Sequence, residues 1–180
     1  MRKFREVAYA VAFVILGAGT VQAQTATQDI NITATVPTAC SINNLATGTA
    51  GTTTIPVSVA GFVNTTPITP TGSPFANVAC NAASFRQLSS LSGGVVNAGA
   101  PPSGFTNIIN YTASATWNSV TVNLNTSTVG TATGIETGAQ QSVATANSGN
   151  LTVSITPLAP SLPLITGAYT DTLRVTLTPQ

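Results

Sequence analysis

The chain has 180 residues, of which only 5% are charged, and it has no His and a formal net charge of +1. After residue 23 it contains no Lys and too few cations for the basic patch that nucleic acids or acidic membranes require, because its charged side chains there are only Asp29, Arg86, Glu136, Asp171 and Arg174. The absence of His excludes a Ser-His-Asp triad, and the surface must be built mainly from Thr, Ser, Asn and Gln.

Residues 1–23 have the organisation of an export signal. A basic start at Arg2, Lys3 and Arg5 is followed by an apolar run at 7–18 and by small residues before Gln24. The apolar run is shorter than the ~20 residues that span a bilayer, although a retained membrane anchor is the alternative. We therefore expect an exported protein whose mature chain begins at Gln24.

Residues 24–37 carry a strand pattern close to this expected N-terminus. Four apolar side chains alternate with polar ones and share one face of an extended chain: Ile30, Ile32, Ala34 and Val36. Pro37 ends the pattern, because proline has no N–H for a strand ladder. The segment is either the first strand of its own domain or a strand donated to a partner, which is called β-augmentation.

Two cysteines, Cys40 and Cys80, follow this segment. An even pair in an exported protein predicts a disulfide, and closing a loop of about 40 residues would stabilise the fold by ~4 kcal/mol in the chain-entropy model. Free thiols are the alternative. A two-cysteine metal site is disfavoured because no His is present to complete it.

Five segments alternate with the period of two that is typical of half-buried strands. Their expected inward residues are Ile55, Val57, Val59 and Val63 in 54–63; Ile109, Tyr111, Ala113, Ala115 and Trp117 in 108–117; Val120, Val122 and Leu124 in 119–125; Leu151, Val153 and Ile155 in 150–156; and Leu173, Val175 and Leu177 in 171–179. Loops rich in Pro and Gly lie at 66–74, 92–104 and 157–167, and a long mobile connection with one short strand is expected at 126–149. No segment after residue 23 has a helical period, so we predict an all-β antiparallel sandwich or barrel.

Three carboxylates lie beyond the expected signal, at Asp29, Glu136 and Asp171. Two of them could in principle act as the acid and base of a glycoside hydrolase, but their positions favour solvated or structural roles. We expect no catalytic site, no cofactor and no metal.

Several motifs, in order along the chain, resemble the archaic chaperone–usher pilins, the family of the spore-coat-protein-U-like domain. They are ATVPTACSI at 34–42, FANVACNAA at 75–83, IINYTASATW at 108–117, GNLTVSITP at 149–157 and GAYTDTLRVTLTPQ at 167–180. The Gly-x-Tyr-x-Asp-Thr opening of the last motif is the most specific, and residues 126–149 depart from the family pattern.

The resemblance implies an incomplete immunoglobulin-like sandwich at residues 38–180 that lacks its last strand. Residues 24–37 of a neighbouring pilin subunit would supply that strand, so the subunits join head to tail. The implied donor side chains are Ile30, Ile32, Ala34 and Val36, and the implied receiving groove is lined by Tyr169, Leu173, Val175 and Leu177. A periplasmic chaperone and an outer-membrane usher are the further partners, and a cell-surface adhesive fibre is the expected location.

Two other functions fit the sequence. A tip or minor subunit would act as an adhesin that binds carbohydrate or another surface through its loops, with Phe105 in the Pro/Gly-rich stretch 99–105 as a contact. A self-complete secreted coat protein would keep residues 24–37 in its own sheet. A soluble monomer would distinguish this last case from a fibre subunit.

Overall fold

The structure is a computed structural model, and it describes residues 28, 30–42, 55–57, 61–71, 73–128 and 134–180. The expected export signal lies outside this part of the chain, as do Asp29 and Val59. The chain divides into two compact units, residues 1–35 and 36–180. In the first unit, residues 28 and 30–35 contain no helix and no strand. No helix among the described residues is long and apolar enough to cross a membrane.

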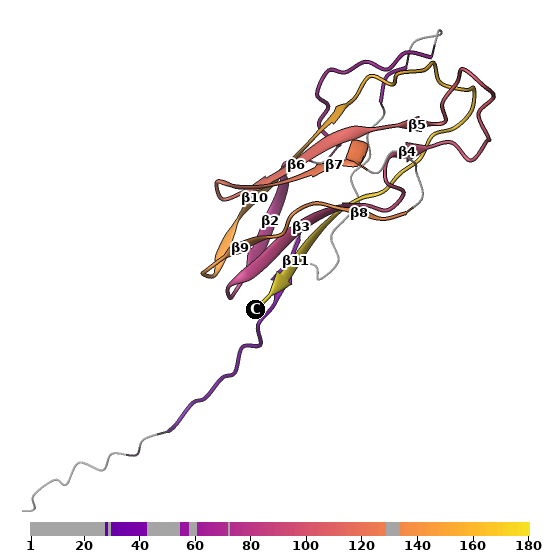
Figure 1. Ribbon diagram of the computed structural model, residues 1–180. Coiled ribbons are helices and arrows are strands. Elements are labelled where there is room, and N and C mark those ends of the chain that lie inside the picture. The colour runs from indigo at the N-terminus through magenta and orange to yellow at the C-terminus, as the bar shows by residue number, and fades with distance from the viewer. Residues whose placement is uncertain (1–27, 29, 43–54, 58–60, 72, 129–133) are drawn as a thin grey trace, which may run out of the picture. The chain divides into compact units, whose positions relative to one another are not determined.

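The second unit consists of two antiparallel sheets and a short hairpin (Figure 1). The larger sheet has the order β1-β2-β10-β6-β7, with bounds Cys40–Ser41, Phe75–Cys80, Asn147–Pro157, Tyr111–Trp117 and Val120–Asn125. The smaller sheet has the order β11-β3-β8, with bounds Leu173–Pro179, Ser84–Ser90 and Glu136–Thr137, and β9 (Gln141–Val143) also pairs with β3. The hairpin joins β4 (Val95–Val96) to β5 (Ile108–Ile109), and η1 is a single 3-10 turn at Thr126–Thr128.

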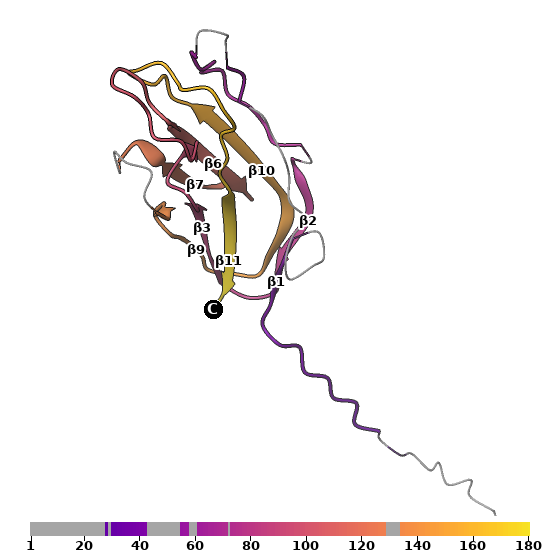
Figure 2. The same ribbon diagram turned by 90° about the vertical axis from the view of Figure 1, so that its right-hand side faces the viewer.

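The two sheets face each other as the layers of a sandwich (Figures 1 and 2). One cluster of buried apolar side chains, drawn from β2, β10, β6 and β7 in one sheet and from β3 in the other, fills the space between them. The described residues contain no α-helix. The prediction of an all-β fold with antiparallel sheets is therefore confirmed.

The strongly alternating segments form the centre of the core. Every inward residue expected in β6 and β10 is buried, as are Ile109 in β5 and Val122 and Leu124 in β7. Asn110 interrupts the expected strand at 108–117, so that β5 and β6 are separate elements. These segments match the prediction because their apolar residues recur at every second position, which is the spacing at which side chains of a strand face the same side.

Strand β3 was not predicted, because its inward face is largely polar. Ser84, Arg86, Leu88 and Ser90 all point into the sandwich and are at most 1% exposed. Hydrophobic alternation is the main sequence signal for a strand, and only Leu88 provides it here. Hydrophobic alternation therefore does not identify β3, although it is the central strand of the smaller sheet.

The expected strand at 54–63 is wrong. Val57 and Val63 pair with each other across an antiparallel bridge, and the amide of Asn64 donates to the carbonyl of Pro56 at 3.0 Å. Gly61 has a φ of 75°, a conformation that glycine adopts without a steric penalty. The chain therefore reverses direction between Val57 and Val63 instead of continuing as one strand.

The connection at 126–149 holds more structure than expected. Its described residues contain η1, β8 and β9, and β10 begins at Asn147. Gly138 lies between β8 and β9, where its amide donates to the carbonyl of Leu88 at 2.9 Å. A side chain at this position would collide with the backbone carbonyl of Asn123 in β7. Strands β8 and β9 thus pair with β3 of the smaller sheet and contact β7 of the larger one.

Candidate strand-accepting edge

Strand β11 forms one edge of the smaller sheet. It pairs with β3 along its whole length, from Leu173 opposite Ser90 to Pro179 opposite Ser84. Among the described residues, no strand pairs with its other edge. Its N–H and C=O groups on that side are therefore available for pairing with another strand.

The inward face of β11 is less buried than the inward faces of its neighbours. Leu173, Val175 and Leu177 pack against the core but are only half-buried, whereas the inward residues of β6 and β10 are buried. The outward residues of β11, including Arg174 and Thr176, are exposed. The core is thus fully covered at its centre and partly open beside β11.

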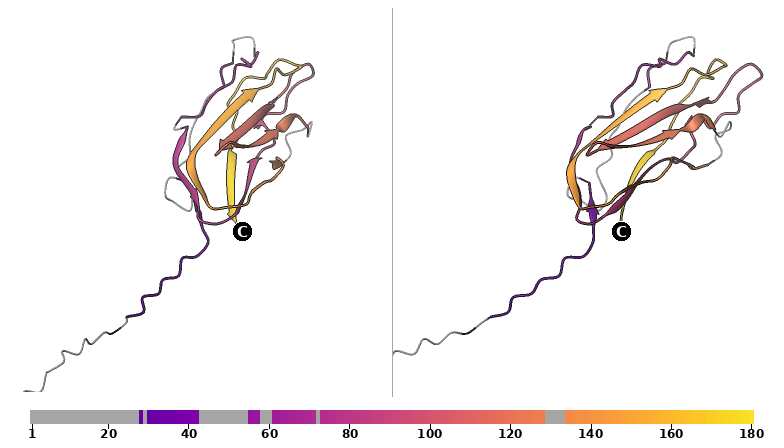
Figure 3. Two further views of the ribbon diagram at one scale, coloured as in Figure 1. Left: turned by 90° about the vertical axis from the view of Figure 1, so that its left-hand side faces the viewer. Right: turned by 60° about the vertical axis from the view of Figure 1, so that its left-hand side comes forward.

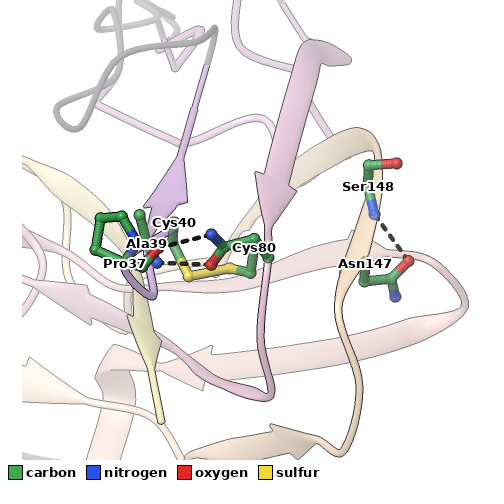
Figure 4. Close-up of a disulfide and its surroundings, with 7 residues drawn as sticks. Pro37, Ala39, Cys40, Cys80, Asn147 and Ser148 are labelled. Atoms are coloured by element: carbon green, nitrogen blue, oxygen red, sulfur yellow. Dashed lines mark hydrogen bonds between the residues drawn. A yellow bond between two sulfur atoms is a disulfide. The ribbon is translucent and has the colours of Figure 1, made fainter. Parts of the chain in front are cut away.

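Strand β1 lies close to β11 and belongs to the other sheet. The predicted disulfide is present: Cys40 of β1 and Cys80 of β2 are joined by an S–S bond of 2.05 Å (Figure 4). Cys40 and Ile42 are half-buried against the core. The partly buried apolar residues at this side of the core therefore come from β1, which a disulfide holds, and from the nearby edge strand β11.

The residues before β1 are held by Asn81. Its Oδ1 accepts a hydrogen bond from the amide of Ala39 at 2.7 Å, and its Nδ2 donates to the carbonyl of Pro37 at 2.8 Å. The amide of Asn81 donates in turn to the carbonyl of Ala39 at 3.1 Å. The direction in which the chain enters β1 is therefore fixed as far back as Pro37.

The four expected donor side chains lie just before Pro37 in the sequence. Ile30 is 80% exposed, Ile32 is 90% exposed and Val36 is 76% exposed, and Ala34 is exposed as well. No helix or strand includes residues 30–39. An alternating apolar segment in solvent is a candidate for pairing with a sheet edge.

Asp171 anchors the start of β11. Its carboxylate accepts hydrogen bonds from the hydroxyls of Ser90 and Tyr111, both at 2.6 Å, and from the amides of Ser92 at 3.0 Å and Thr172 at 2.7 Å. Ser90 lies in the smaller sheet and Tyr111 in the larger one, so a single carboxylate connects the two layers. Burial, together with the hydrogen bond to Asp171, raises the pKa of Tyr111 well above its ordinary value.

Tyr169 lies two residues before Asp171 and is half-buried. Its hydroxyl donates to the carbonyl of Ile165 at 3.0 Å, with the carbonyl of Thr106 at 3.3 Å. The side chain thereby ties the start of β11 to two loops at that end of the sandwich. Burial raises its pKa as well.

Arg86 is a cation in the core that the sequence analysis did not single out. Its guanidinium lies 4.8 Å from the centroid of the Trp117 ring, and Nη1 donates to the carbonyls of Trp117 and, at 3.0 Å, Val120. Nε and Nη2 have no hydrogen-bond partner among the described residues. Burial lowers the pKa of this group. Arg86 thus links β3 to the turn between β6 and β7 through π-face and carbonyl contacts.

Two carboxylates lie near Ser90 in the described residues: Asp171 accepts a hydrogen bond from its hydroxyl, and Glu136 lies opposite it in β8. No group of three or more His, Cys, Asp or Glu that could hold a metal occurs in the described part of the chain. The hydrogen bonds from the Tyr111 and Ser90 hydroxyls to Asp171 join residues that are 60 and 81 positions apart in the sequence, so no local motif could have revealed them.

The chain matches no protein-family model, no curated protein and no solved structure.

Proposed function

We propose that this chain is a structural subunit of a secreted adhesive fibre in which each subunit is completed by a strand from its neighbour. The observation that carries the proposal is β11: an edge strand whose inward residues Leu173, Val175 and Leu177 are only half-buried. An unpaired edge beside an incompletely covered core is the surface that strand addition requires.

The order of the strands supports an incomplete immunoglobulin-like sandwich. In the constant-type immunoglobulin fold, strands A, B, E and D form one sheet and C, F and G the other. When the letters are assigned to the strands along the chain, the order β1-β2-β10-β6 in the larger sheet corresponds to A-B-E-D. Strands β3 and β11 of the smaller sheet then correspond to C and F. The missing strand is G, whose place is the free edge of β11.

The segment before β1 has the composition of the missing strand. Ile30, Ile32 and Val36 are large apolar side chains on one face, and burying them contributes ~1.5–3 kcal/mol each, or roughly 5–9 kcal/mol together. About eight backbone hydrogen bonds would add about 1 kcal/mol each. Ordering the segment opposes this gain by ~1–2 kcal/mol per residue, so slow strand release, rather than a large equilibrium constant, would make the fibre durable.

A strand donated from one copy to the next gives a heterologous contact, which continues into a filament instead of closing on itself. Before assembly the open edge is an aggregation hazard, which explains the need for a periplasmic chaperone and for an outer-membrane usher that receives the protected subunit. Carried through the periplasm in this way, the subunit reaches the cell surface as part of a fibre.

The test is a charge on the donor face. Ile32→Asp should abolish the ladder of multimers, because a carboxylate cannot enter an apolar groove without a large desolvation cost, while the chaperone-bound subunit stays folded. The measurement is electrophoresis of exported material before and after boiling in detergent. Thr33→Asp, one residue away on the polar face, is the matched control and should polymerise. A normal ladder from Ile32→Asp would rule out the donor assignment.

A further inference from the structure

Three loops meet at the end of the sandwich that lies opposite the C-terminal residue (Figures 1 and 3). We call them the loop platform, and their described parts are residues 61–64, 97–107 and 158–167. The amide of Leu164 donates to the carbonyl of Gly61 at 3.3 Å, the amide of Thr106 to that of Pro163 at 2.9 Å, and the amide of Ile165 to that of Thr106 at 3.0 Å. The three loops are therefore bonded to one another.

Two asparagines fix the shape of the middle loop. Asn107 Nδ2 donates to the carbonyls of Asn97 and Gly99, both at 3.0 Å, and Asn97 Oδ1 accepts from the amide of Gly99 at 2.7 Å. Thr170, three residues before β11, pairs with Val96 at the edge of this loop. The platform is thus an ordered surface joined directly to the start of the accepting strand.

The platform exposes large apolar side chains. Phe62 is 59% exposed, Phe105 is 44% exposed and Leu162 is 41% exposed, and each lies within two residues of a contact between the loops. The platform residues include no Asp, Glu, Lys or Arg. Exposed apolar side chains on three uncharged loops that are bonded to one another make this end a candidate interaction site.

The opposite end of the sandwich, which we call the base, presents small apolar side chains. It consists of residues 37–39, 81–83 and 144–146, together with Gln180, whose amide donates to the carbonyl of Ala83 at 2.8 Å. It contains five alanines, Ala39, Ala82, Ala83, Ala144 and Ala146, and no Asp, Glu, Lys or Arg. Side chains as small as these let another surface approach closely.

We infer that the loop platform of one copy docks on the base of the copy that donates a strand to it. The inference rests on the proposed function and on the length of one linker. Only Pro37, Thr38 and Ala39 separate Val36, the last donor side chain, from Cys40, the first residue of β1. Four residue steps span at most ~14 Å, and hydrogen bonds from Asn81 to Pro37 and Ala39 fix this linker within the base.

The direction of the donated strand decides which end the linker reaches. Every pair of named strands in the described part of the chain is antiparallel, and antiparallel pairing is slightly more stable per residue. A strand antiparallel to β11 ends beside Leu173, three residues after Thr170. The base of the donating copy then lies within ~14 Å of that point, beside the platform of the receiving copy.

Engineered cysteines test this contact in assembled fibres of the full chain. With Phe105→Cys and Ala144→Cys in the same chain, mild oxidation should join each platform to the next base. The expected result is a ladder of multimers that survives boiling in detergent and collapses to monomer with reductant. The matched control carries Thr152→Cys, on the outward face of β10, with Ala144→Cys, and it should give no such ladder.

The outcomes separate the inference from the proposed function. Fibres that form without any platform-to-base cross-link would overturn the docking contact and leave strand donation intact, whereas absence of fibres from the unmodified chain would overturn strand donation itself.

A second variant replaces Phe62, Phe105 and Leu162 with Ser. Its fibres should form but lose stiffness in electron micrographs. Fibres of unchanged stiffness that no longer attach to an apolar surface would assign the platform to adhesion and refute the docking contact.

Discussion

At the scale of single residues, the polar groups inside the sandwich connect its layers more specifically than the apolar ones do. Asp171 accepts hydrogen bonds from side chains in both sheets, and Arg86 bonds β3 to the turn after β6. Buried polar groups are costly unless they are paired, so each of these contacts favours one alignment of the two sheets. The network of Asp171 fixes where β11 begins, and therefore where an accepted strand would pair.

The first prediction concerns Asp171 and Tyr111. Asp171→Asn and Tyr111→Phe should each lower the free energy of unfolding by ~1.5–3 kcal/mol, the range for hydrogen bonds to a charged group. The double variant should lose less than the sum, because one change removes the donor and the other the acceptor's charge of the same hydrogen bond. Chemical unfolding measures these values, with the exposed Arg174→Gln on the same strand as a control near zero. Strictly additive losses would show that the two groups do not interact.

The second prediction concerns alkaline pH. The pKa of Tyr111 is raised in the folded protein by burial and by Asp171, so above its unfolded value of ~10 the unfolded chain loses a proton that the folded chain keeps. Stability is fully present below that pH and should fall as the pH rises further. Tyr111→Phe should flatten this fall in urea titrations between pH 9 and 11, roughly the range around the tyrosine pKa. An unchanged slope would contradict the assignment. Tyr169→Phe should flatten the fall as well, because burial also raises the pKa of Tyr169.

At the scale of elements, the sequence predicts the strands in which apolar and polar residues alternate without a break. The alternation in β6, β7, β10 and β11 identified both the strands and their inward faces. Strand β2 was missed because a positive φ at Asn77 interrupts its pattern, and β3 was missed because Ser84, Arg86 and Ser90 take inward positions. The expected strand at 54–63 was wrong because the chain reverses direction between Val57 and Val63. The contacts of Asp171 could not be predicted, since they depend on which strands become neighbours.

The third prediction concerns β1, which has only two residues and pairs with β2. The disulfide closes a segment with a sequence separation of 40, so replacing both cysteines with Ser should lower the free energy of unfolding by up to ~4 kcal/mol. The yield of exported subunit should fall with it. The measurement is chemical unfolding beside reduced wild-type protein. Equal unfolding midpoints for the variant and the oxidised wild type would contradict a stabilising role.

At the scale of the whole molecule, an incomplete domain should be stabilised by whatever completes it. A ligand that binds only the folded state raises stability with its concentration, by ~2.7 kcal/mol at a hundred times its Kd. In the proposed function, the half-buried inward face of β11 is the surface that a donor segment covers. That function therefore predicts that the stability of the isolated chain depends on the presence of a donor segment.

The fourth prediction tests this dependence directly. A synthetic peptide of residues 24–37, added to the mature Ile32→Asp variant, should raise its melting temperature in proportion to the logarithm of peptide concentration. The same peptide with Ile32→Asp should have no effect. A variant whose melting temperature is insensitive to the unmodified peptide would indicate a sandwich that is already complete.

The placement of the two arginines after residue 23 has a practical consequence for following assembly. Trypsin cuts after Lys or Arg, and after residue 23 the sequence offers it only Arg86, which is enclosed in the core, and Arg174, which is exposed in β11. Cleavage of the native protein at the Arg174–Val175 bond requires β11 to detach locally from β3, because a strand within a ladder does not fit a protease cleft. The rate of this single cut therefore reports how often the edge strand opens. A decrease in the cleavage rate during assembly would show when a donated segment binds to β11.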